Sequence, residues 1–237
     1  AEIQGYFEGV AKKYELDSHF RFNSEIVRAE YRDGRWHLSI KGGATDVVDF
    51  VICATGVLHH PAYPDIPGLG DFEGACFHSA RWDHSVPLEG KRIGIIGTGS
   101  TAIQIVPALA DTVSKLTLFQ RTAQWILPLA NPAYSEAEKA MYHTSPERLQ
   151  QSYDFWSARF VDTFARAVIG DQDELRKIED ACRTNLEENV ADPELRRRLT
   201  PNYRATCKRL IMSDIFYPAM QKPSVALVTD GIDRIEA

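Results

Sequence analysis

The spacing of apolar residues over the first 40 positions predicts one helix followed by a pair of strands. Apolar side chains recur every three or four residues over 3–14, which indicates a helix. Residues 26–31 and 36–40 have strand character, and Asp33-Gly34 between them is typical of a tight hairpin turn. We therefore expect a β-hairpin after the first helix.

Two other apolar stretches in this part of the chain also have strand character. One is formed by Phe20 and Phe22, and the other runs over 47–54, interrupted only by Asp49. After them, residues 57–70 are rich in proline and glycine, which predicts an extended connector. We place the first domain boundary there.

Beyond the connector the pattern predicts a strand, a helix and a second strand. Residues 92–96 read as a short buried strand, 100–110 as a helix that Pro107 should kink or shorten, and 116–119 as the next strand. Helical spacing then dominates 135–199, and strand character returns at 225–228. The prediction is an α/β chain with a helical insertion.

Composition and charge exclude several classes of partner. The net charge of the 237 residues is −6, so no basic surface favours nucleic acid or an anionic membrane. No apolar run approaches the roughly 20 residues of a membrane-spanning helix, and no signal segment precedes the first helix. The chain does not begin with Met, so we expect further sequence upstream.

The cysteines and histidines indicate neither disulfides nor a metal. Cys53, Cys76, Cys182 and Cys207 form no CxxC pair, and no histidine or cysteine cluster has ligand spacing. Free thiols are typical of a reducing cytoplasm, which is the localisation we expect. We expect no metal site.

A glycine-rich turn lies between the predicted strand 92–96 and the helix that follows. The sequence at 97–102 fits GxGxxG/A, in which the first glycine permits the turn, the second admits a pyrophosphate, and the small last residue packs against the strand. Backbone N–H groups at the helix start would then face the phosphates. A plain glycine turn is the alternative. The candidate cofactor-binding residues are Gly97, Thr98, Gly99, Ser100, Thr101 and Ala102.

The residues after the second strand indicate which nucleotide would bind. An NAD site has an acidic residue roughly 20 positions on, to accept from the ribose 2′-hydroxyl. Here the strand is followed by Arg121 and Thr122, which can bind a 2′-phosphate. The alternative is a solvated surface arginine. We favour NADP(H).

A second pattern lies just upstream of the turn, in the segment 72–83, which we call the signature segment. It contains Phe72, Gly74, His78, Trp82 and Asp83. Their spacing resembles the signature of the type I Baeyer–Villiger monooxygenases, within the flavin-containing monooxygenase superfamily. Those enzymes use FAD and NADPH to insert one O2 oxygen atom next to a ketone carbonyl through a C4a-peroxyflavin. Related N- and S-oxidising enzymes, the alternative, lack the tryptophan.

The resemblance implies roles for four further residues. Thr55 and Gly56 match the family's link between its two dinucleotide-binding domains, and we expect them near the cofactor. Lys208 matches a lysine that helps to hold the 2′-phosphate, and Arg209 an arginine that lies over the flavin, so Arg209 is the catalytic candidate. A guanidinium can stabilise a developing oxyanion. A solvated basic pair is the alternative. For His78 and Trp82, a hinge role between domains and proton transfer both remain open.

The expected fold is therefore α/β: a Rossmann-like NADP-binding domain with a helical insertion, plus a remnant of an FAD-binding domain. Family members begin with their own glycine-rich turn for FAD, which this sequence lacks, so we expect an incomplete FAD site. A stand-alone NADP(H)-binding module without oxygenase activity is the alternative. The expected segments are 1–56 for the remnant, 57–134 and 200–237 for the two parts of the NADP-binding domain, and 135–199 for the insertion.

Replacement of Arg121 tests the phosphate assignment. We expect Arg121→Ala to weaken the binding of NADPH much more than that of NADH, because only NADPH presents a 2′-phosphate to the guanidinium. Dissociation constants for both nucleotides would measure the difference. Equal losses for the two would contradict the assignment.

Overall fold

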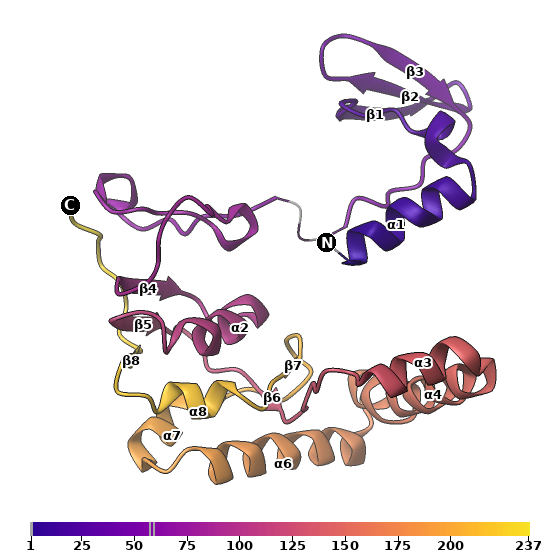
Figure 1. Cartoon of the computed structure of the whole chain (residues 1–237). Coiled ribbons are helices and arrows are strands. Elements are labelled where there is room, and N and C mark those ends of the chain that lie inside the picture. Colours follow the sequence, from indigo (N-terminus) through magenta and orange to yellow (C-terminus); the bar gives the residue numbers. More distant parts are fainter. Residues whose placement is uncertain (1, 57, 59) are drawn as a thin grey trace. The chain divides into compact units, whose positions relative to one another are not determined.

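The computed structural model describes residues 2–56, 58 and 60–237. The chain forms two compact units, which divide between His60 and Pro61, and each is described by itself (Figure 1). The boundaries proposed at 56, 134 and 199 stay predictions.

The first unit is a helix with a small antiparallel sheet. It consists of α1 (Glu2–Lys13), a 3-10 turn (Leu16–His19), β1 (Ile26–Arg32), β2 (Arg35–Ile40) and β3 (Thr45–Val48), with strand order β1-β2-β3. The predicted helix and hairpin are confirmed. Asp33 and Gly34 have positive φ angles of 52° and 78°, as the twist of a two-residue hairpin requires.

One predicted strand in this unit is wrong, and another is shorter than expected. Residues 49–54 do not continue β3, and Phe20 and Phe22 precede β1 instead of forming a strand. A strand needs a partner for its backbone groups, and β3 pairs with β2 only through residues 45–48. The apolar side chains beyond it are open to solvent: Phe50 and Ile52 are 87% and 89% exposed.

The second unit is built on a parallel sheet of order β4-β5-β8. These strands are β4 (Arg92–Ile96), β5 (Lys115–Phe119) and β8 (Val225–Val228), and both pairings are parallel. Helix α2 (Ser100–Leu109) joins β4 to β5, and α8 (Phe216–Met220) precedes β8. The predicted β–α–β order and the return to a strand at 225–228 are confirmed.

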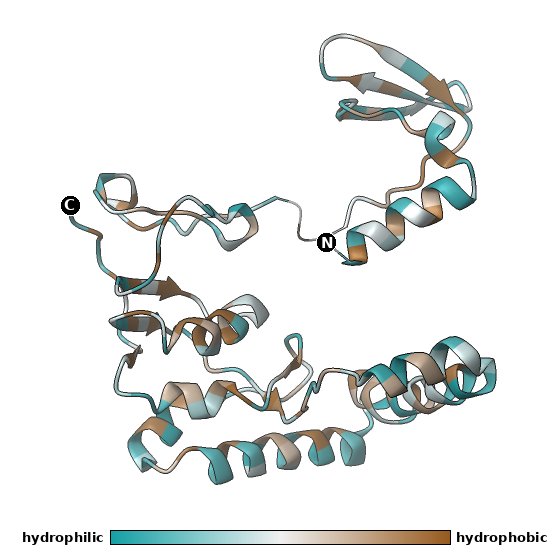
Figure 2. Cartoon of the chain, in the orientation of Figure 1, coloured by the Kyte–Doolittle hydropathy of each residue, from teal (hydrophilic) through white to brown (hydrophobic). Residues whose placement is uncertain are grey.

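The core of this unit lies around the central strand and helix α2. Leu116 and Leu118 of β5 have no exposed surface, and neither has Val106 of α2, while Ile103 is 1% exposed. Full burial of each such side chain stabilises the fold by about 1.5–3 kcal/mol. The prediction that 92–96 is buried is wrong, because β4 is an edge strand in the described part of the chain and Ile96 is 47% exposed. Figure 2 shows β4 and β5 as predominantly apolar.

The insertion is helical, as predicted. Ser135 forms the expected capping box with Glu138. The helices are α3 (Glu136–Thr144), α4 (Pro146–Arg159), a π-helical stretch (Phe160–Ala165), α5 (Arg166–Val168), α6 (Gln172–Asn189) and α7 (Pro193–Leu199).

Two very short strands form a separate pair that joins the chain before the insertion to the chain after it. β6 (Ile126–Leu127) and β7 (Ile211–Met212) pair in parallel. They bring the segment that follows β5 beside the segment after α7. The sequence did not predict them, because two-residue strands have no detectable periodicity.

A buried carboxylate ties α6 to that returning segment. Glu179 is 5% exposed and accepts hydrogen bonds from Nε of Arg204 at 2.7 Å and from the backbone N–H of Ala205 at 3.0 Å. Burial raises the pKa of Glu179, but these hydrogen bonds and the charge of Arg204 outweigh it and hold the pKa below its ordinary value of 4.5.

Because the folded state lowers this pKa, the stabilisation is present above pH 4.5 and is lost as the pH falls through the folded-state pKa. We expect Glu179→Gln to lose about 1 kcal/mol of unfolding free energy at pH 7 and to show a shallower loss on acidification. Denaturant unfolding from pH 7 to 3 measures both effects. Glu188→Gln, on the exposed part of the same helix, is the control and should lose stability on acidification as steeply as the parent protein. An equally shallow loss in both variants would contradict the assignment.

Candidate nucleotide-binding site

The glycine-rich turn follows β4 and opens helix α2. Gly97 has a φ of 105°, a conformation that glycine adopts without steric penalty, and its N–H donates to the carbonyl oxygen of Phe119 at 3.0 Å. A Cβ atom added to Gly99 would meet no heavy atom within 4 Å. The space over this part of the backbone is therefore open.

The first turn of α2 presents free backbone donors. The N–H of Ile103 donates to the carbonyl oxygen of Gly99 at 3.1 Å. In the described part of the chain, the N–H groups of Ser100, Thr101 and Ala102 have no acceptor. Unpaired donors at the positive end of a helix bind anions such as phosphate. Ala102 is 7% exposed and packs into the core, as expected for the small last residue of the pattern. The turn therefore fits a nucleotide pyrophosphate.

A buried hydroxyl holds this turn against the end of β5. Oγ1 of Thr98, a residue that is 7% exposed, donates to the carbonyl oxygen of Thr122 at 2.7 Å. Arg121, the preceding residue, is exposed. Its guanidinium has no hydrogen-bond or ion-pair partner among residues 2–56, 58 and 60–237. The predicted phosphate-binding arginine is thus adjacent to the predicted glycine turn and available to an anion.

The segment after α7 is also linked to this turn. Nζ of Lys208 lies 4.6 Å from the ring centroid of Tyr203, and the Tyr203 hydroxyl donates to Oε1 of Gln124 at 2.9 Å. Nε2 of Gln124 lies 3.5 Å from Oγ1 of Thr98, a weak contact. Tyr203 and Gln124 were not predicted from the sequence, because no motif joins two polar residues so far apart in the chain.

Arg209, the catalytic candidate, is exposed, and no other described residue bonds to its guanidinium. Thr55 and Gly56 belong to the first unit, where Gly56 has a φ of 70° and a Cβ there would meet nothing within 4 Å. These residues are all accessible to a ligand on their own units.

Close packing explains the first half of the signature segment. A Cβ on Gly74 would fall 2.5 Å from Cε1 of Phe72, so the Phe72 ring lies directly against the glycine backbone. The backbone N–H of His78 donates to the Tyr63 hydroxyl at 3.1 Å. Phe72 and Gly74 therefore form one packing unit, and His78 is tied to the connector.

The second half of the signature segment is a short 3-10 turn (Ser79–Arg81). Nδ1 of His78 accepts from the N–H of Ala80 at 3.0 Å, while Trp82 ends the turn and packs against Phe77, with ring centroids 5.3 Å apart. His78 and Trp82 thus do not share a face of an α-helix.

Asp83, the last signature residue, forms its own local turn. Its Oδ1 accepts from the hydroxyl and the backbone N–H of Ser85, at 2.6 and 2.9 Å. These hydrogen bonds lower the pKa of Asp83, so the carboxylate is ionised. It acts here as a structural acceptor.

Other features of the described residues do not add a second site. Residues 2–56, 58 and 60–237 contain no group of three or more histidine, cysteine or acidic side chains placed to hold a metal. Within the same ranges no helix combines the length and apolar character needed to cross a membrane. The cysteines are free, and burial raises the pKa of the Cys182 thiol to about 12, which makes it unreactive.

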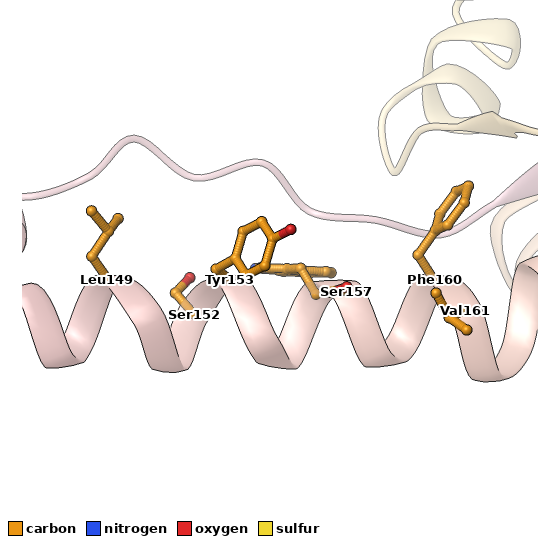
Figure 3. A pocket seen from close by; sticks show the side chains of 7 residues that line it. Leu149, Ser152, Tyr153, Ser157, Phe160 and Val161 are labelled. Atoms are coloured by element: carbon orange, nitrogen blue, oxygen red, sulfur yellow. The ribbon is translucent and has the colours of Figure 1, made fainter.

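One hollow of the second unit lies away from the glycine turn. It has a volume of about 480 Å³ and is lined by the exposed face of α4 and the π-helical stretch. Figure 3 shows Leu149, Tyr153 and Phe160 projecting from the same side of this helix. The lining contains no charged side chain. Its chemistry is that of an apolar surface and not of a catalytic site.

A parallel sheet whose first strand–helix turn is glycine-rich defines a Rossmann-type domain, which confirms the predicted α/β fold. Within that class, residues 1–137 match the family described as flavin-binding monooxygenase-like. The chain belongs to this family.

The chain is also similar to individual members along nearly its whole length. It is 49% identical over 235 residues to an uncharacterized monooxygenase of Mycobacterium tuberculosis, covering 99% of the chain and 47% of that relative. It is 41% identical over 237 residues to a Baeyer-Villiger monooxygenase of Streptomyces coelicolor, covering 98% and 45%. The resemblance drawn from the signature segment is therefore confirmed.

A solved structure agrees with these relatives. The crystal structure of OTEMO in complex with FAD and NADP aligns with a TM-score of 0.77 and 27% identity, over 96% of this chain and 50% of that one. The chain thus spans about half the length of the curated relatives it matches.

Loss of the Thr98 hydroxyl tests how the turn is held. We expect Thr98→Val to lower the unfolding free energy by about 1 kcal/mol, because it leaves the Thr122 carbonyl without its donor. Denaturant unfolding measures the change. Thr98→Ser should restore most of the loss, and Thr101→Val, on the exposed side of the turn, is the control. Equal effects at 98 and 101 would contradict this role.

Proposed function

We propose that this chain is the NADPH-binding part of an FAD- and NADPH-dependent Baeyer–Villiger monooxygenase, which inserts one oxygen atom of O2 next to a ketone carbonyl. The observation that carries the proposal is the open glycine turn at the start of α2, with Arg121 adjacent to it and no acidic residue directly after β5. The Streptomyces coelicolor relative supports the reaction class.

The nucleotide would be held by backbone and side chains together. The free N–H groups of Ser100, Thr101 and Ala102 would bind the pyrophosphate, and Gly99 would let it approach. Arg121 would bind the 2′-phosphate in a forked geometry. Thr122 would add a hydroxyl and Lys208 a second positive charge. When bound, NADPH supplies a hydride.

The oxygen chemistry would depend on FAD, which activates O2 when it is reduced and bound. Thr55 and Gly56 would face this cofactor. The sequence has a single stretch that fits GxGxxG/A, at 97–102, so we propose that polypeptide outside these 237 residues supplies the rest of the FAD site. Arg209 is the proposed catalytic residue: its permanent positive charge would stabilise the oxyanion that forms as oxygen adds to the ketone carbonyl.

The test uses the longer polypeptide that contains these residues. Purified protein should have a flavin absorption spectrum and should convert a ketone into an ester only when NADPH and O2 are present. Oxidation of amines and sulfides but never of ketones would place it with the N- and S-oxidising enzymes. A colourless protein that still binds NADPH would favour a stand-alone nucleotide-binding module.

A variant of the turn connects the activity to this site. Gly99 has an ordinary φ of −68°, so we expect Gly99→Ala to fold with stability within about 1 kcal/mol of the parent protein. Its methyl group would occupy the pyrophosphate approach and raise the KM for NADPH severalfold. Gly231→Ala, where a Cβ also meets nothing within 4 Å, is the matched control. An unchanged KM in Gly99→Ala would contradict the assignment.

A further inference from the structure

The ammonium group of Lys208 lies over an aromatic ring and not beside a carboxylate. Its Nζ is 4.6 Å from the centroid of Tyr203, within the range of a cation–π interaction. In the part of the chain that the structure describes, Lys208 forms no ion pair, although acidic residues pair with many other basic side chains. Contact with a ring restrains the lysine without neutralising it, so its charge stays available to an anion.

The tyrosine under this lysine is held by three contacts, one of them through its backbone. The backbone carbonyl of Tyr203 accepts from Nε1 of Trp125 at 2.7 Å, and its hydroxyl donates to Gln124 at 2.9 Å. The side chain packs against the cluster that includes Cys182 and Ala205. Burial raises the pKa of the Tyr203 hydroxyl, so it remains a protonated donor. The ring is therefore a rigid platform.

The platform is anchored to the segment that also holds the glycine turn. Gln124 and Trp125, which bind the Tyr203 side chain and backbone, follow Arg121 and Thr122 in the sequence with only Ala123 between them. Gln124 also approaches the hydroxyl of Thr98. One short stretch of chain thus connects the platform of Lys208, the predicted phosphate-binding arginine and the turn.

We propose that Tyr203 is a positioning residue that presents the Lys208 ammonium to the 2′-phosphate of NADPH, and so contributes to the preference for NADPH over NADH. The inference rests on the proposed NADPH site. A free lysine side chain samples many rotamers, and holding it in advance reduces the entropy lost when the phosphate binds.

The experiment measures dissociation constants for NADPH and NADH with the longer polypeptide. We expect Tyr203→Leu to weaken NADPH binding about two- to fivefold, the range of an exposed cation–π contact, with NADH little changed. Tyr203→Phe keeps the ring and should retain most of the preference. The double variant Tyr203→Leu/Lys208→Ala should bind NADPH no more weakly than Lys208→Ala, because the platform acts only through the lysine.

Three outcomes would overturn the inference: equal losses for NADPH and NADH in Tyr203→Leu, no loss at all, or additive losses in the double variant. If Tyr203→Leu does not fold, trifluorophenylalanine in place of Tyr203 keeps the shape of the ring but weakens its attraction for a cation. It should then lose NADPH affinity relative to Tyr203→Phe, and equal affinities would overturn the inference. If Arg121→Ala also fails to separate NADPH from NADH, the proposed site itself is wrong. If Arg121→Ala separates the two nucleotides but the Tyr203 variants do not, the NADPH site stands and the positioning role of Tyr203 is wrong.

Discussion

The burial of strand β5 between β4 and β8 is the constraint on which the second unit depends. Leu116 and Leu118 are fully buried there, and both neighbours pair with β5 in parallel. Parallel pairing places the carboxyl ends of the strands at one edge of the sheet, which is where such domains bind ligands. This pairing makes the turn after β4 and Arg121 after β5 neighbours, and the hydrogen bond from Thr98 to Thr122 holds the two segments together.

Long-range hydrogen bonds to the segment after β5 hold the insertion in place. Nε2 of Gln120 donates to the carbonyl oxygen of Arg198 at 2.7 Å, and Nδ2 of Asn185 donates to that of Ile126 at 3.0 Å. Each such bond contributes about 1 kcal/mol. Their larger effect is on position, because they bring the segment that contains Lys208 back to the carboxyl edge of the sheet.

The local elements were predictable where a short stretch of sequence contains the whole signal. The capping box at Ser135, the helix after Gly99 and the strand at 225–228 are examples, since caps and periodicity act over a few residues. The predictions that failed concern pairing and burial. The apolar run 49–54 has no partner strand among the described residues, and the apolar strand β4 lies at an edge. Neither fact is encoded locally.

The same division applies to the candidate site. By itself the sequence determined the glycine turn, the arginine where an NAD site would have an acid, and the signature segment, because each depends on residues near one another in the chain. Only the tertiary structure decided that Tyr203 lies under Lys208 and bonds to Gln124. The bond to Gln124 joins the two segments that also pair as β6 and β7 on either side of the insertion. Two-residue strands become stable only when packing supplies their partners, so no local sequence pattern predicts them.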